Sequence, residues 1–236
     1  SAKRGIHFEP PRIDLNQMRA WKEGILQKLS QGVAWLAQKR GVQVIAGRGY
    51  FEDSHTLRVE TDQGQTFIRF DKAIIAVGSH PAMPKAFDLG NPRVMTSTEA
   101  LDIPDIPERL LLIGGGYIGM EMGTVYAGLG SQVVLVEALD TILAGADPDL
   151  VRPVLRYAEQ NFKEIRLKTQ VAGMATAGKQ IEVTFNLGGQ KKEELYDRVL
   201  VAVGRVPNGD FLGLENTKVA RDDKGFIQVT HRQQTT

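Results

Sequence analysis

Three glycines, at a spacing that suits dinucleotide phosphates, follow a short apolar run. Gly114, Gly116 and Gly119 come directly after residues 110–113, which are all leucine or isoleucine. The first glycine permits a tight turn out of a strand, the second lets a pyrophosphate approach the backbone, and the third lets a helix pack closely on that strand. The free N–H groups at the start of such a helix attract an anion. The spacing therefore predicts a dinucleotide site between a strand and a helix.

An acidic residue lies where the ribose of such a dinucleotide would need one. Glu137 ends a second apolar run, residues 133–136, and stands 18 residues after Gly119. A carboxylate there accepts hydrogen bonds from the adenosine ribose hydroxyls and repels a 2′-phosphate, so the sequence favours NAD over NADP. Glycines are also common in ordinary turns. Here, however, the predicted strand, the helix, the second strand and the acidic residue at its end all agree with a dinucleotide site.

Composition places this site in an ordinary globular protein. The 236 residues can form one large domain or two smaller ones, and a net charge of +1 gives no electrostatic case for nucleic acid or an anionic membrane. No apolar run reaches membrane-spanning length, and the first residues lack the apolar core of a signal peptide. The absence of cysteine excludes disulfides and thiolate chemistry within this chain. We expect a cytoplasmic protein. The four histidines lie in apparent loops without carboxylate partners at telling spacing, so we also expect no metal site.

The first hundred residues predict a long helix followed by strands. Apolar residues recur at helical spacing over residues 14–39, so we expect an amphipathic helix whose apolar face packs in the core. Residues 42–46 are predicted as a strand, residues 49–70 as a β-meander, and residues 73–78 as a buried strand ending at a glycine. Five prolines between positions 81 and 107 predict a connector between two domains.

The second half predicts a unit in which strands and helices alternate. The helix after the glycines is expected to end at Gly130, and another helix to begin with Asp147 as its cap and Pro148 in its first turn. The remaining predicted elements are a strand at 165–167, a meander at 171–195 that turns at Gly188 and Gly189, and a buried strand at 199–204.

One phrase occurs twice, 126 residues apart, each time after a meander. Residues 70–81 and residues 196–207 share an aromatic residue, an aspartate, a basic residue, four apolar residues, Val-Gly and a later proline. Buried parallel strands resemble one another in sequence, which would explain the match without common ancestry of two domains. The alternative, which we favour, is two related nucleotide-binding domains, of which only the second has its glycine turn in this chain.

In combination these motifs resemble the flavoprotein disulfide reductases with two dinucleotide-binding domains, and among them most the dihydrolipoamide dehydrogenases. The resemblance covers essentially the whole chain. It is carried by residues 21–24, 29–32, 73–79, 114–121, Glu137 and 204–208. It implies an α/β fold, with a Rossmann-like NAD-binding domain that has a β-meander crossover and part of a related FAD-binding domain. The implied domains are 1–107, part of the FAD-binding domain with a connector; 108–205, the NAD-binding domain; and 206–236, the return to the FAD-binding domain.

The resemblance implies two groups of cofactor-binding residues. NAD would contact Gly114, Gly115, Gly116, Tyr117, Ile118, Gly119, Glu121, Glu137, Val171 and Gly204. FAD would contact Gly49, Val77, Gly78 and Ser79. Within the NAD group, Tyr117 would cover the nicotinamide pocket and Glu121 would face the flavin.

The resemblance also implies the chemistry of the intact protein. In this family dihydrolipoamide reduces a cysteine pair, electrons pass to FAD, and a hydride passes from the flavin to NAD⁺. The cysteine pair would precede the equivalent of Ser1, and a dimerisation domain with the catalytic His–Glu pair would follow Thr236, so we expect no catalytic residue in this chain. The implied partners are the lipoyl-bearing acyltransferase of 2-oxoacid dehydrogenase complexes and a second copy of the enzyme. The alternatives are another NADH-linked flavoprotein reductase or oxidase, and a non-catalytic dinucleotide-binding module.

Overall fold

The computed structural model describes residues 5, 9, 11–187 and 190–235, with the backbone alone at position 187. The chain divides into two compact units. The first unit comprises Ser1–Ala34 and Met83–Ala202, and the second comprises Trp35–Ala82 and Val203–Thr236. Within the described part of the chain, no helix has both the length and the apolarity needed to cross a membrane.

A five-stranded parallel sheet forms the centre of the first unit. Its strands lie in the order β5-β12-β6-β7-β8, and every neighbouring pair runs parallel. Their bounds are Val94–Met95 for β5, Arg198–Val201 for β12, Arg109–Ile113 for β6, Gln132–Val136 for β7 and Glu164–Arg166 for β8. Because both faces of this sheet are covered, its central strands β12, β6 and β7 are almost continuously apolar, as the sequence predicted for residues 110–113, 133–136 and 199–201.

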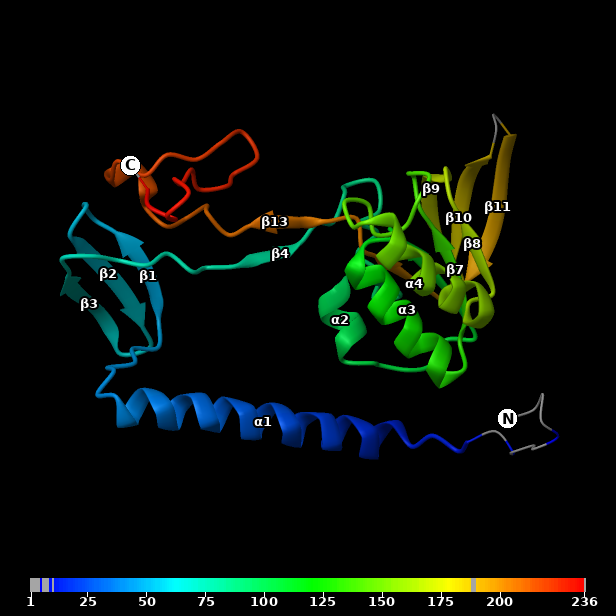
Figure 1. The fold of residues 1–236 in the computed structure, drawn as a ribbon, viewed down its shortest axis with the longest axis horizontal. Helices are drawn as coiled ribbons and strands as arrows, with labels where there is room; N and C mark the ends of the chain where they lie inside the picture. The colour runs from blue at the N-terminus through cyan, green and yellow to red at the C-terminus, as the bar shows by residue number, and fades with distance from the viewer. Residues whose placement is uncertain (1–4, 6–8, 10, 188–189, 236) are drawn as a thin grey trace. The chain divides into compact units, whose positions relative to one another are not determined.

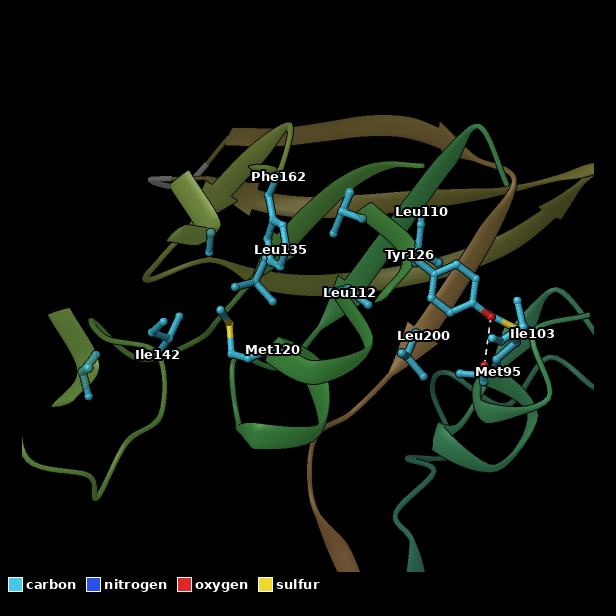
Figure 2. Close-up of a cluster of buried hydrophobic side chains, with 14 residues drawn as sticks. Met95, Ile103, Leu110, Leu112, Met120, Tyr126, Leu135, Ile142, Phe162 and Leu200 are labelled. Carbon is cyan, nitrogen blue, oxygen red and sulfur yellow. Dashed lines mark hydrogen bonds between the residues drawn. The ribbon is translucent and has the colours of Figure 1, made fainter. Parts of the chain in front are cut away.

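Helices cover one face of the sheet and a meander covers the other (Figure 1). Successive side chains of a strand point to opposite faces, so Leu110 and Leu112 pack with the helices while Leu111 and Ile113 pack with the meander. Figure 2 shows the helix-side cluster, where Tyr126 donates a hydrogen bond to the Ala100 carbonyl (3.1 Å). The helices are α2 (Ser97–Leu101), α3 (Tyr117–Leu129) and α4 (Pro148–Asn161), and the meander strands are β9 (Gln170–Ala177), β10 (Gln180–Leu187) and β11 (Gln190–Tyr196). This architecture confirms the predicted α/β fold class.

Most helix ends and strands of this unit lie where the sequence predicts them. Gly130 ends α3 with a left-handed backbone (φ 109°), as a glycine there allows. Asp147 and Pro148 occupy the cap and the first turn of α4, although the Asp147 side chain makes no capping hydrogen bond. The predicted turn at Gly188 and Gly189 lies outside the described residues.

A network of charges holds the meander to the edge strand β8. The Arg166 guanidinium bonds to Glu164 (2.6 Å) and to Glu194 (3.0 Å), and Glu194 also accepts hydrogen bonds from Lys192 (2.9 Å) and the Tyr196 hydroxyl (2.7 Å). Burial alone would raise the pKa of Glu194, but its three hydrogen-bond donors outweigh burial and lower that pKa to about 2. The carboxylate therefore stays ionised at any ordinary pH.

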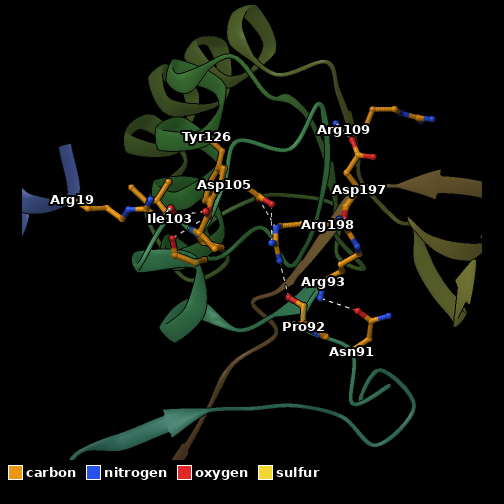
Figure 3. A network of polar contacts seen from close by, with 12 residues as sticks. Arg19, Asn91, Pro92, Arg93, Ile103, Asp105, Arg109, Tyr126, Asp197 and Arg198 are labelled. Atoms are coloured by element: carbon orange, nitrogen blue, oxygen red, sulfur yellow. Dashed lines mark hydrogen bonds and ion pairs between the residues drawn. The ribbon is translucent and has the colours of Figure 1, made fainter. Parts of the chain in front are cut away.

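In the second copy of the repeated motif, Asp197 and Arg198 make structural contacts at the edge of the sheet where β12 and β6 begin (Figure 3). Asp197 accepts a hydrogen bond from the backbone N–H of Arg109 (2.8 Å), which aligns β12 with β6. Arg198 forms a two-point ion pair with Asp105 (2.5 and 2.8 Å) and donates to the Pro92 carbonyl (2.7 Å), so it fastens the proline-rich connector. Its guanidinium lowers the pKa of the Asp105 carboxyl.

Helix α1 (Leu15–Lys39) forms as predicted, but its apolar face does not lie in a core. Asp14 caps the helix by accepting from the N–H groups of residues 16 and 17, and Arg19 bonds to the Ile103 carbonyl (3.0 Å). No residue of α1 is buried, and Trp21 is 71% exposed. The expectation of core packing is therefore wrong for the described chain, because only the first turns of α1, through Leu15 and Met18, reach the apolar cluster of the first unit.

The second unit is built from short antiparallel elements. One sheet contains β1 (Arg48–Phe51), β2 (Thr56–Thr61) and β3 (Gly64–Arg69), which confirms the first predicted meander. A two-stranded ribbon pairs β4 (Ser79–Pro81) with β13 (Arg205–Pro207), and a 3₁₀ turn, η2, spans Leu214–Asn216.

Two predicted strands of the second unit do not form. Residues 42–46 and 73–78 have no strand structure, and the Ile74 side chain is 95% exposed. A buried parallel strand needs hydrogen-bonding neighbours and a covering layer. The described residues supply neither to these two segments, whereas the matching segment of the repeat, β12, has β5 and β6 beside it.

Candidate dinucleotide site

The glycine turn joins β6 to α3 at the carboxyl edge of the parallel sheet. Gly114 has a left-handed backbone (φ 108°), and its N–H donates to the Val136 carbonyl (2.9 Å). A Cβ at Gly119 would overlap the carbonyl oxygen of Gly114, so only glycine lets the helix start so close to the strand. The end of β12 also lies here, because the N–H of Ala202 donates to the Ile113 carbonyl (2.8 Å).

The first turn of α3 offers unpaired backbone donors to an anion. Gly116 is the exposed N-cap of the helix, and a Cβ placed on it would meet nothing within 4 Å. The first N–H groups of a helix have no intrahelical acceptor, and they lie at the positive end of its dipole. Tyr117, 61% exposed, and the half-buried Ile118 follow in this turn, while Glu121 lies one turn further on and is exposed.

The Glu137 carboxylate lies against the glycine turn. Its Oε2 accepts a hydrogen bond from the N–H of Gly115 (2.6 Å), and its Oε1 accepts one from the N–H of Leu139 (2.8 Å). Val136 and Ile113 are paired in the sheet, which is why the residues that follow them come together. Each carboxylate oxygen has two lone pairs, so one acceptor site on each oxygen remains for two ribose hydroxyls.

Loops that the sequence analysis did not single out hold this carboxylate and the turn. The N–H of Leu143 donates to the Gly115 carbonyl (2.8 Å), and the fully buried Ile142 packs beside Gly115. The N–H of Thr169 donates to the Glu137 carbonyl (2.9 Å). The apolar pair at 142 and 143 is the one signal in the sequence that could have drawn attention to this loop.

The structure brings only part of the predicted NAD group together. Gly114 to Gly119 and Glu137 converge at one edge of the first unit, with Glu121 on the outer face of α3. Val171 lies in β9, half-buried against the meander-side cluster. Gly204 belongs to the second unit, where its carbonyl accepts from the N–H of Ala82 (3.0 Å).

The residues predicted to contact FAD all lie in the second unit. The Val77 and Gly78 carbonyls accept hydrogen bonds from the side chain and the backbone of Asn208 (2.9 and 3.0 Å), and Ser79 accepts one from Arg205 (2.7 Å). Gly49 lies apart from them in β1, where it pairs with Val59. These contacts fix the β4–β13 ribbon, and the proposed flavin contacts stay a prediction.

Comparison with known proteins agrees with this architecture. A family profile described as pyridine nucleotide-disulphide oxidoreductase matches residues 3–236. The chain is 42% identical to the dihydrolipoyl dehydrogenase of Haemophilus influenzae over 234 residues, which are 99% of this chain and 49% of that protein. It is 39% identical to the dihydrolipoyl dehydrogenase of Haloferax volcanii over 235 residues, which are 98% of this chain and 49% of that protein. The chain thus spans about half the length of the curated relatives it matches.

Solved structures show the same fold. LpdA from Mycobacterium tuberculosis superposes with a TM-score of 0.87 at 24% identity, covering 99% of this chain and 52% of that one. The HOCl-induced flavoprotein disulfide reductase RclA from Escherichia coli superposes with a TM-score of 0.82 at 27% identity, covering 95% of this chain and 50% of that one.

Proposed function

Because the chain belongs to the pyridine nucleotide-disulphide oxidoreductase family, we propose that it is the NAD-binding core of a flavin-dependent dihydrolipoamide dehydrogenase. The observation that carries the NAD assignment is the Glu137 carboxylate, which is held by Gly115 and Leu139 beside an open glycine turn. A phosphate on the ribose 2′-oxygen would approach this negative charge, whereas two free hydroxyls would donate to it.

The chemistry of the residues at the sheet edge suits NAD. The N–H groups of residues 116–119 would bind the pyrophosphate, and Glu137 would bind the adenosine ribose. Bound NAD⁺ supplies the acceptor for a hydride from reduced flavin. The protein's part is to orient the nicotinamide, and by family resemblance Tyr117, Glu121 and Val171 would contact NAD. Contact of Gly204 with NAD is likewise proposed from the resemblance alone.

The rest of the proposal concerns the intact protein. Residues 108–205 would be its NAD-binding domain, and residues 1–107 and 206–236 would belong to the FAD-binding domain and connector. The FAD contacts at Gly49 and Val77 to Ser79 rest on the resemblance, because residues 73–78 do not form the expected strand. The lipoyl-bearing acyltransferase component and a second copy of the enzyme are the proposed partners. The name dihydrolipoyl dehydrogenase, which the relatives carry, supports the first of them, and the second rests on the family resemblance.

Titration with reduced dinucleotides tests the NAD assignment. We expect the purified chain to quench or enhance NADH fluorescence on binding, and to bind NADPH at least about 10-fold more weakly. Glu137→Ala should abolish most of that difference. Equal affinity for NADH and NADPH in the parent chain would refute the assigned role of Glu137.

A visible absorption spectrum tests the flavin part separately. A flavin band in the purified intact protein, together with lipoamide-dependent oxidation of NADH, would support the dehydrogenase assignment. A protein that carries flavin and oxidises NADH with oxygen but not with lipoamide would instead favour an NADH oxidase.

A further inference from the structure

Gly115 is a glycine that the dinucleotide fingerprint does not require. The fingerprint needs glycine at 114, 116 and 119 and leaves position 115 open. Gly115 has no left-handed backbone that would demand glycine, and it is buried. Its lack of a side chain therefore needs another explanation.

Both peptide groups of Gly115 are already used within the protein. Its N–H donates to Glu137 Oε2 (2.6 Å), and its carbonyl accepts from the N–H of Leu143 (2.8 Å). This N–H is therefore bonded to the carboxylate that is proposed to bind the ribose, and it is not among the donors proposed for the phosphates. Gly115 connects the phosphate turn to Glu137.

A side chain at position 115 would press against two neighbours. A Cβ there would lie 3.0 Å from Ile142 Cγ2 and 3.3 Å from Glu137 Oε2. Both distances are tighter than ordinary van der Waals contact, so each neighbour must give by a few tenths of an ångström.

The Glu137 carboxylate is the neighbour that can move. Ile142 is fully buried in the helix-side cluster, and its loop is tied to the turn through Leu143. Glu137 is only half-buried, and its carboxylate is held by two hydrogen bonds. Of the two neighbours, the Glu137 carboxylate is thus the one that a methyl group at 115 would displace more readily.

We propose that Gly115 is a positioning residue for cofactor preference, which it sets by leaving space for the Glu137 carboxylate. The proposal rests on the proposed binding of NAD. It predicts that a substitution at 115 acts on ribose recognition and spares phosphate recognition, although residue 115 belongs to the phosphate turn.

A double-mutant cycle tests this coupling on the full chain. Dissociation constants for NADH and NADPH are measured for the parent, Gly115→Ala, Glu137→Ala and the double variant. We expect Gly115→Ala to weaken NADH binding about 10-fold, the effect of one lost charge-assisted hydrogen bond, and to change NADPH binding less than about twofold. In the Glu137→Ala background, Gly115→Ala should change neither constant.

Two further variants distinguish a positioning role of Gly115 from general disruption of the glycine turn. Leucine carries no methyl group on its β-carbon, so Ile142→Leu should relieve the first contact and restore NADH binding to Gly115→Ala. Gly116→Ala places a methyl group in the phosphate approach and should weaken NADH and NADPH equally.

Three results are distinguishable. Failure of the parent chain to bind either dinucleotide would overturn the proposed function itself. A parent that prefers NADH, with Gly115→Ala binding both dinucleotides like the parent, would overturn the role of Gly115 alone. Equal weakening of both dinucleotides by Gly115→Ala, undiminished in the Glu137→Ala background, would also overturn it.

Discussion

Glu137 accepts two backbone hydrogen bonds, so its replacement changes the loop as well as the charge. Glu137→Arg should shift the preference toward NADPH, because a cation would meet the 2′-phosphate. Since arginine cannot accept from Gly115 and Leu139, we expect the shift to arise mainly from NADH binding that is about 100-fold weaker. Fluorescence titration with both dinucleotides measures the two constants.

Glu159→Arg, an equal charge change on the exposed face of α4, serves as the control and should leave both constants unchanged. Tight NADPH binding by Glu137→Arg, equal to NADH binding by the parent, would show that the two backbone hydrogen bonds are dispensable.

Glu194 contributes stability that depends on pH. Its pKa is about 2 in the folded protein and has a reference value of 4.5, so its contribution is complete above pH 4.5 and is lost as the pH falls toward 2. Glu194→Gln should therefore lower the free energy of unfolding by about 2 to 3 kcal/mol at pH 7. The difference from the parent should shrink below pH 4, as urea denaturation at several pH values would measure.

The neighbouring Glu193 provides a matched control, because its side chain is exposed on the same strand. Glu193→Gln removes the same formal charge and should change the free energy of unfolding by less than about 0.5 kcal/mol. Equal effects of the two variants would mean that the network around Arg166 adds nothing to stability.

Two glycines of helix α3 should respond oppositely to the same substitution. A Cβ at Gly123 would lie 2.6 Å from Leu112 and from Phe162, so Gly123→Ala should destabilise the protein by about 1 to 3 kcal/mol. A Cβ at Gly128 would meet nothing within 4 Å, and Gly128→Ala should stabilise it by about 0.5 to 1 kcal/mol through helix propensity. Thermal denaturation without cofactor measures both, and a gain in stability for both variants would contradict the close packing of α3 on β6.

The sequence predicts elements well where pattern and neighbours agree. The strands and helix around Gly114 form as expected because each apolar run has its partner within the first unit. Residues 73–78 carry an equally apolar run, yet all of them except the half-buried Ile75 stay exposed. A hydrophobic pattern indicates which side chains favour burial, but it does not indicate which segment covers them. The exposed apolar side chains of α1 have the same explanation.

The candidate site shows a similar division. The spacing of Gly119 and Glu137 predicts that a carboxylate meets the turn, and the parallel register of β6 and β7 brings them together. The contacts of Ile142 and Leu143 could not be predicted, because they arise from an irregular loop without periodicity. The two copies of the repeated phrase likewise gave no indication that Asp197 and Arg198 align the sheet and fasten the connector.

The two units differ greatly in the size of their apolar cores. Among the described residues, Val59 and Leu214 are the buried apolar residues of the second unit, while the first unit contains two large clusters. We expect amides of β6, β7 and β12 to exchange with deuterium most slowly, and amides of β1 to β3 at least about 100-fold faster. Hydrogen exchange with mass spectrometry measures this difference.

Limited proteolysis gives an independent check of the same difference. Early cleavage should fall within residues 35–82 and 203–235, and a fragment close to residues 83–202 should persist. Equal protection of both units would contradict the small core of the second.

The order of strands in the parallel sheet has a consequence for synthesis on the ribosome. β12 lies between β5 and β6, yet it is the last of the five strands to be translated. Until Val201 has left the ribosome, β6 has an open edge and β5 has no neighbour in the sheet. Open edges pair with other chains. The nascent protein is therefore most exposed to mispairing during translation of the meander, and a pause there would prolong that exposure.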